Sequence, residues 1–481
     1  MNSIAQERRY LLRSTAVSFG GLFVNQTLQT AGGVVMARLI ASPTLFGQIN
    51  VMLQILGMSG LFLNAGLNSA ATFFVAKHGA KAIRTVYGPA LAGSFLVGAL
   101  AAAVLSLLSA PIAAVYHVPE LSPGLIAGSF VLLTNSLINV GIALFSGMRR
   151  FAIQAYLMVT ATLLSVVGMV VGILLSPQTS SGLPVIAGVM SATNVLTCAV
   201  VLFCVRFVYR APALVPLNGR RMWRMLRYGV PIYAGNIAKA FQQSFLVVIT
   251  GATSIVDAGY LSNAMKLAGY LNIITWAFNI VALPFLSQAA HSEVDARRRA
   301  TLCFRYNNFI LLPLTLLLCM YPDALILALF GAKYDTASSV LYVRLTAVGV
   351  LFSSVSRLGG MLLSGIGRTR ANFWTMIVSG ALVFFAAPIA VRQAPALGTA
   401  VFVLGWGLSA ASLFWFLVHD GLSLDWRRAF VEPLLPTAAL AVILEAGALV
   451  PHGSIPAAIL GLSGASVATW LLERPIFQPA A

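Results

Sequence analysis

Acidic side chains are scarce in this chain, which has 12 Asp and Glu residues against 30 Lys and Arg among 481 residues. Charged residues of both signs make up only 9% of the sequence, whereas hydrophobic residues make up 59%. So little charge excludes an ordinary soluble domain, and the mean hydropathy of +0.90 is typical of a polytopic membrane protein. Cysteine is also rare, and the four residues lack the spacing of metal ligands or of a redox pair. We therefore expect no metal and no cofactor.

Long apolar runs predict an all-α fold with 12–14 membrane-spanning helices, because each crossing needs about 20 apolar residues. Twelve of these spans are strongly apolar, and two near the end are weaker. The predicted spans cover residues 16–40, 47–75, 86–110, 125–145, 151–175, 185–207, 228–250, 259–289, 304–321, 340–365, 373–391 and 398–418, followed by the weaker pair 430–450 and 455–472.

Basic residues outside these spans or within two residues of a span end, Arg305 among them, lie almost entirely at the two termini and in alternate gaps between spans. The exceptions are Arg38, Lys333 and Arg392, which fall in the opposite set of gaps. This asymmetry is typical of the positive-inside rule, so both termini are expected in the cytoplasm. The net charge of +18 then reflects membrane orientation, and no nucleic-acid partner is expected.

The two halves of the chain resemble each other. Gly47 begins a long span after a short gap, and Gly259 occupies the same place six spans later. A shift of six spans preserves orientation, so the halves would be related by a pseudo-twofold axis along the membrane normal. We predict two six-helix lobes over residues 1–210 and 211–420, with two additional helices over 421–481. The binding site is expected in a central cavity between the lobes.

Four basic residues lie more than two residues inside predicted spans: Lys239, Lys266, Arg344 and Arg357. A charge at the bilayer centre costs about 2.5 to 3.5 kcal/mol on insertion scales, so such a cation is expected to face a wet cavity or a partner anion. Lys239 is about 11 residues into its span, which at 1.5 Å per residue is too deep for a lysine stem to reach the surface. The positive sign predicts an anionic cargo.

Arg357 is the better candidate of the two arginines, because a guanidinium binds phosphate oxygens bidentately. Arg344 is 13 residues away on the same predicted helix, so the two side chains leave it about 140° apart and cannot both face one cavity. Pairing of Arg344 with Asp335 or with a lipid phosphate is an equally good interpretation.

Amide side chains accompany the cations at helical spacing. Asn236, Lys239 and Gln243 share one helical face, which indicates a lined polar surface. Further amides suited to sugar hydroxyls occur in the first half as two pairs four residues apart, Asn25 with Gln29 and Asn64 with Asn68. For these pairs, cavity lining and hydrogen bonding between helices are equally good interpretations.

Short motifs in the second half resemble, in their order, those of a known family. They are Tyr228, Gly229, Val230 and Pro231 opening a span, then Gly259, Tyr260, Ala264 and Lys266, then Leu329, Phe330, Gly331, Lys333, Tyr334 and Leu341, and finally Ser364, Gly365, Gly367 and Arg368. Over roughly residues 10–420 the chain resembles the polysaccharide transporter family, the Wzx-type oligosaccharide flippases. That family shares a superfamily with the multidrug and toxin extrusion antiporters and the lipid II flippase.

The resemblance implies a flippase that moves a polyisoprenyl-pyrophosphate-linked oligosaccharide across the bacterial inner membrane by alternating access. The implied partners are this lipid-linked substrate, the bilayer, and the glycosyltransferases and polymerase of a pathway for O-antigen, capsule or exopolysaccharide. No catalytic residue is expected, and the chain is not predicted to be an enzyme.

A cation-coupled multidrug and toxin exporter of the same superfamily is the main alternative. It would need buried carboxylates, but only Glu445 lies deep in a predicted span, and all five histidines lie at span ends. A membrane-embedded glycosyltransferase or polymerase would need catalytic acids or a large extramembrane loop. The sequence offers neither.

Overall fold

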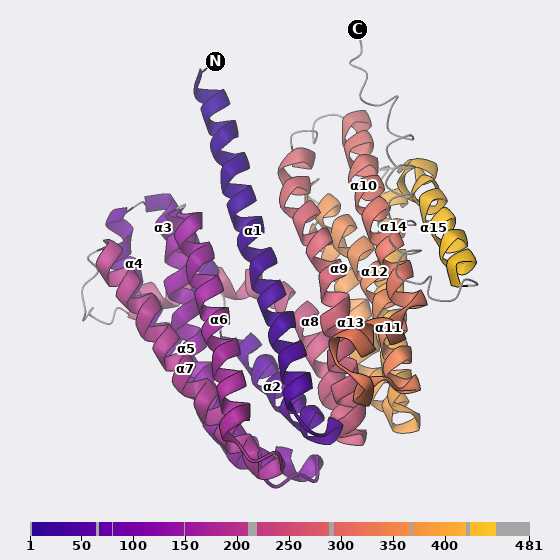
Figure 1. The fold of residues 1–481 in the computed structure, drawn as a ribbon. Helices are drawn as coiled ribbons and strands as arrows, with labels where there is room; N and C mark the ends of the chain where they lie inside the picture. Colours follow the sequence, from indigo (N-terminus) through magenta and orange to yellow (C-terminus); the bar gives the residue numbers. More distant parts are fainter. Residues whose placement is uncertain are drawn as a thin grey trace. The chain divides into compact units, whose positions relative to one another are not determined.

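The structure is a computed structural model, and it describes residues 2–63, 67–78, 80–148, 150–209, 219–287, 293–365, 369–419 and 424–448. Within these ranges the chain is almost wholly helical and contains no strand (Figure 1). The predicted all-α architecture is confirmed. The helices form two compact units, Met1–Asn263 with Ala387–Gly398, and Ala264–Ala386 with Thr399–Ala481.

Most helices lie wholly within one unit. The first unit contains α1 (Asn2–Leu39), α2 (Pro43–Leu63), α3 (Leu67–His78), α4 (Ala80–Val115), α5 (Leu121–Gly147), α6 (Phe151–Leu175), η1 (Ser180–Gly182), α7 (Leu183–Tyr209) and α8 (Gly219–Thr253). The second contains α10 (Glu293–Met320), α11 (Pro322–Leu329), η2 (Ala332–Tyr334), α12 (Ala337–Gly365), the π-helix η3 (Arg427–Val431) and α15 (Glu432–Ala448). Three helices contribute to both units: α9 (Ile255–Ser287), α13 (Thr369–Gln393) and α14 (Pro395–His419).

Predicted spans and observed helices agree closely where apolar length decides the boundaries. α6 covers the predicted residues 151–175. The span predicted over 47–75 is covered by α2 and α3, and residues 64–66 between them are outside the described ranges. The span predicted over 455–472 also lies outside the described residues.

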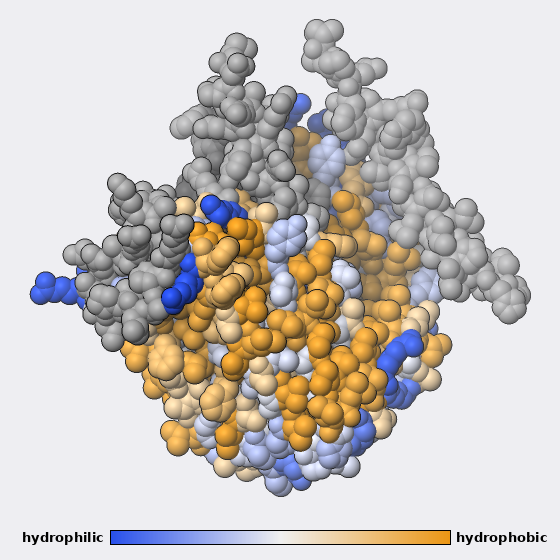
Figure 2. Space-filling model, turned by 60° about the vertical axis from the view of Figure 1, so that its left-hand side comes forward, coloured by the Kyte–Doolittle hydropathy of each residue, from blue (hydrophilic) through white to orange (hydrophobic). Residues whose placement is uncertain are grey.

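Eight described helical segments are long and apolar enough to cross a membrane. Apolar residues predominate on the coloured part of the face shown in Figure 2, and the most hydrophilic residues lie toward its margins. Exposed large side chains such as Leu107 and Phe385 suit a hydrocarbon surrounding, whereas a soluble protein rarely exposes so continuous an apolar surface. The chain is a multi-pass membrane protein.

Small residues allow close helix contacts in the first unit, where α5 packs against α3, α4 and α7, and α6 packs against α1 and α7. A Cβ added to Gly168 of α6 would lie 2.2 Å from Thr193 Oγ1 of α7. One added to Gly172 would lie 3.0 Å from Ile186 Cα. Membrane helices commonly associate through such small residues, because lipid tails provide no hydrophobic driving force between helices.

The starts of α2 and α9 have the same local structure. Ser42 Oγ accepts a hydrogen bond from the Leu45 N–H at 3.2 Å, and Ser254 Oγ accepts one from the Asp257 N–H at 3.2 Å. Both serines cap a helix N-terminus, and the interval between them in the sequence equals the interval between Gly47 and Gly259. The internal repeat inferred from the sequence therefore extends to hydrogen bonds at the helix starts.

The two equivalent glycines also touch each other. A Cβ added to Gly259 would lie 3.2 Å from Gly47 Cα, and one added to Gly47 would lie 2.0 Å from the Ile255 carbonyl oxygen. The contact shows why position 47 requires glycine.

Candidate functional site

The predicted cation Lys266 lies on a polar face of α9. Gly259, Ser262, Asn263 and Lys266 fall on one side of the helix, because their spacing returns to the same side over two turns. Ser262 and Asn263 are 2% and 1% exposed. Neither the Ser262 hydroxyl nor either polar atom of the Asn263 amide has a hydrogen-bond partner among the described groups. A buried unpaired group costs about 1 to 3 kcal/mol, so the Ser262 and Asn263 groups are suited to bind water or a polar ligand. The same face packs on Gly47 of α2 at Gly259.

The predicted cation Arg357 lies on α12 beside a hydrogen-bonded cluster that joins three helices. Ser354, one turn before Arg357, shares a hydrogen bond with Thr275 of α9. Asn307 of α10 donates from Nδ2 to Ser354 Oγ at 3.2 Å. Because residues three apart are neighbours on a helix surface, half-buried Arg357 extends from the side of α12 that meets α9 and α10.

Lys266 and Arg357 are not on facing helix surfaces. Lys266 precedes Thr275 by nine residues, which places the two about 180° apart around α9. Thr275 is the residue that meets Ser354 on the Arg357 side of α12. The described contacts therefore put Arg357 on the α12 side of α9 and Lys266 on the opposite side of that helix.

Arg344 is exposed, and a contact with α10 accounts for its position. Its Nε donates to the Cys319 carbonyl oxygen at 3.0 Å, and the Cys319 Sγ–H donates to the Arg344 carbonyl oxygen at 3.9 Å. The pairing with Asp335 considered from the sequence is not among the ion pairs of the described chain. The contact supports a structural role for Arg344.

The other candidates on α8 are only partly described. Asn236 and Lys239 fall within α8, but their side chains lie outside the described part of the chain. Gln243, the third member of the predicted stripe, is half-buried. The α8 stripe therefore stays a prediction.

The amides of the first half have different surroundings. Asn25 Oδ1 accepts a hydrogen bond from Thr162 Oγ1 of α6, a contact that favours the interhelical interpretation for this residue. Gln29 is exposed on α1, and Asn68 is half-buried on α3. Asn64 lies outside the described residues.

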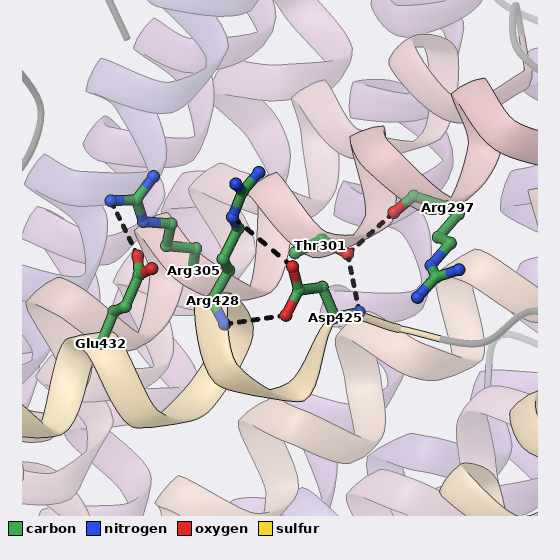
Figure 3. A network of polar contacts seen from close by, with 6 residues as sticks. All are labelled: Arg297, Thr301, Arg305, Asp425, Arg428 and Glu432. Atoms are coloured by element: carbon green, nitrogen blue, oxygen red, sulfur yellow. Dashed lines mark hydrogen bonds and ion pairs between the residues drawn. The ribbon is translucent and has the colours of Figure 1, made fainter. Parts of the chain in front are cut away.

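A buried ion pair was missed at the sequence level, where Arg305 was counted with the basic residues of a cytoplasmic gap. Arg305 of α10 is buried, and its Nη2 lies 2.9 Å from Glu432 Oε2 of α15 (Figure 3). Asn308, one turn further along α10, donates from Nδ2 to the Ala429 carbonyl oxygen at 2.9 Å. These contacts hold the start of α15 on α10. The only sequence signal was a helical row of polar residues in α10, Thr301, Arg305 and Asn308.

The fold is that of a class of membrane transporters. It is similar to the lipid II flippase MurJ in an inward closed conformation, with a TM-score of 0.78, 11% sequence identity, and 96% of this chain and 99% of that chain covered. It is also similar to an inward-facing multidrug resistance MATE family transporter of the MOP superfamily, with a TM-score of 0.66, 14% identity, and 85% and 98% covered. At these identities the likeness shows the fold alone.

Sequence comparison shows the family. A family model described as polysaccharide biosynthesis protein matches residues 35–364, and the chain belongs to this family. This confirms the resemblance drawn from the sequence motifs. The fold is one found in membrane transporters.

One curated relative also matches part of the chain. It is an uncharacterized membrane protein of Methanocaldococcus jannaschii, 22% identical over 213 residues. The match spans 42% of this chain and 41% of the relative, so the chain covers less than half the length of that protein.

Proposed function

We propose that the protein is a flippase that moves a polyisoprenyl-pyrophosphate-linked oligosaccharide across a bacterial inner membrane by alternating access. The polysaccharide biosynthesis family and the transporter fold support flippase-type transport. The finer proposal comprises this cargo, cytoplasmic termini, and cooperation with glycosyltransferases and a polymerase that build a surface or exported polysaccharide.

The observation that carries the proposal is the placement of cations inside α8, α9 and α12, whose single carboxylate, Asp257, lies in the first turn of α9. Lys239, Lys266 and Arg357 all fall inside residues 35–364, which the family model matches. Lys266 shares its helix face with buried polar groups that lack partners among the described groups, and Arg357 flanks a hydroxyl and amide cluster. Such surroundings suit a cargo that combines phosphate charge with sugar hydroxyls.

In the proposed mechanism, the pyrophosphate head binds Lys239 and Lys266 in an inward-open state. Arg357, which lies on the other side of α9, binds the phosphates at a different step of the cycle. Amide side chains hold the glycan, and the polyisoprenyl tail stays in the bilayer. The anionic head offsets the cost of about 2.5 to 3.5 kcal/mol for each embedded cation. Rocking of the lobes then exposes the head to the periplasm.

The proposal is tested by replacing the deepest cation. Lys239→Gln keeps a polar side chain of similar length but removes the charge, so export of the lipid-linked glycan should be abolished while membrane insertion is unchanged. The matched control is Arg220→Gln, which removes an exposed charge at the start of the same helix and should leave export intact. Normal export by a correctly inserted Lys239→Gln variant would remove the proposed role.

A further inference from the structure

A basic and aromatic surface lies at one end of the second unit, outside the proposed cargo site. It consists of Arg297 and Arg298 at the start of α10 and Trp426, Arg427 and Arg428 at the start of η3, all of them exposed. We call it the arginine–tryptophan surface. Its two parts are far apart in the sequence, since α11, α12, α13 and α14 all lie between them.

The fold brings the two parts together through α10. The Asp425 backbone N–H donates to Thr301 Oγ1 at 3.3 Å, and Thr301 Oγ1 donates to the Arg297 carbonyl oxygen at 2.9 Å (Figure 3). Arg297 precedes Thr301 by one helical turn, so the segments that carry the arginines are neighbours. Packing of Trp426 against Phe414, with ring centroids 4.7 Å apart, fixes the aromatic part.

Among the described side chains, most of the positive charge in this region has no ion-pair partner. Arg305 is neutralised by Glu432, and Arg428 lies 3.5 Å from Asp425 in a pair whose side chains are 66% and 41% exposed. An exposed pair of this kind interacts weakly. Arg297, Arg298 and Arg427 take part in no ion pair within the described chain. These three exposed guanidinium groups, unpaired among the described side chains, are suited to attract an external anion.

The structure beside these charges is apolar, and this indicates which anion fits. Val431, Leu434 and Leu435 continue from the π-helix into α15 with exposed side chains. Trp426 is 45% exposed, and tryptophan is enriched where hydrocarbon meets headgroups. A ligand that meets all of these groups has a phosphate for the arginines and acyl chains for the leucines.

We propose that the arginine–tryptophan surface binds the headgroup of an acidic phospholipid. Arg297, Arg298 and Arg427 contact the lipid phosphate and its anionic headgroup, Trp426 lies at the level of the glycerol, and the acyl chains run along Leu434 and Leu435. The residues of this site differ from the proposed cargo cations on α8, α9 and α12. The lipid-binding proposal therefore does not depend on which substrate is transported.

The test is photo-crosslinking of the full-length protein in vesicles that contain a photoactivatable phosphatidylglycerol or the matched phosphatidylcholine. The phosphatidylglycerol probe should label peptides within residues 424–435 preferentially. Each cation near an anionic lipid surface is worth roughly a fivefold change in affinity, so Arg297→Gln/Arg298→Gln/Arg427→Gln should weaken phosphatidylglycerol binding on the order of a hundredfold. All three side chains are exposed, and unchanged helix content and thermal unfolding would verify the fold of the variant.

The matched control is Arg206→Gln/Arg220→Gln/Arg227→Gln, which removes three exposed arginines from the first unit. Labelling of 424–435 should survive in this control. Equal loss of phosphatidylglycerol labelling in both triple variants would show general charge attraction and overturn the proposal. Equal labelling by the phosphatidylcholine probe would also overturn it. Displacement of the probe by millimolar inorganic phosphate would identify a free-phosphate site and overturn the lipid assignment.

Discussion

The ion pair between Arg305 and Glu432 gives the sharpest test of how the second unit is held together. Its side chains are 5% and 24% exposed, and their charged atoms are 2.9 Å apart. Glu432→Gln leaves a buried guanidinium without its counter-charge, a change that typically costs about 3 to 5 kcal/mol. Because Glu432 is partly exposed, we expect a value near the lower end, about 3 kcal/mol.

This loss of stability should make local opening of α15 more frequent, because the pair joins α10 to the start of that helix. A loss of about 3 kcal/mol raises the opening constant roughly 100-fold, measurable as faster amide hydrogen exchange in peptides from residues 427–448. The exposed pair gives the control, since Asp425→Asn should change exchange by less than about fivefold.

A double replacement separates charge loss from the pair's net contribution. Arg305→Met with Glu432→Leu removes both charges together and should restore exchange to near the wild-type rate, because replacing a whole buried pair by apolar groups is often neutral. Unchanged exchange in Glu432→Gln would refute the reasoning, and so would a double variant as damaged as the single one.

Two further outcomes are expected. Gly47→Ala should lower the free energy of unfolding in detergent by about 3 kcal/mol or more, because the new Cβ would lie 2.0 Å from the Ile255 carbonyl oxygen. The control Gly57→Ala, in the same helix, meets nothing within 4 Å and should be neutral or slightly stabilising. Equal effects of the two variants would contradict the close contact at position 47. Arg357→Lys should keep transport but weaken cargo binding about tenfold by losing one hydrogen bond of a bidentate pair, and an unchanged affinity would show that charge alone is needed at this position.

The helices could be predicted from the sequence because the membrane imposes a length. Continuous apolar runs of about 20 residues have few alternatives to a helix in hydrocarbon, which is why the bounds of α6 were predicted correctly. Short elements carry no such signal. The eight-residue α11 and the 3-10 turn η2 fall in a segment with too few apolar residues for a crossing, and neither was predicted.

The candidate site was harder to predict, because the depth of a residue in a span does not determine the direction in which its side chain points. The sequence identified Lys266 and Arg357 as deep cations, but their placement on different sides of α9 depends on which faces of α9 and α12 pack together. That packing is set by Thr275 and Ser354, which are distant in the sequence. Arg305 shows the converse case, since a basic residue near a span end was assigned to the cytoplasmic surface although a distant acid pairs with it inside the unit.

The central claim is that embedded cations bind the pyrophosphate of a lipid-linked sugar. Binding of polyisoprenyl pyrophosphate to the purified protein, followed by native mass spectrometry, tests it most directly, with the corresponding polyisoprenyl alcohol as the uncharged comparison. We expect the pyrophosphate to bind and the alcohol not to bind, and we expect Lys239→Gln, Lys266→Gln and Arg357→Gln each to weaken binding at least about tenfold. Equal binding of the alcohol, or undiminished binding by all three variants, would contradict the account.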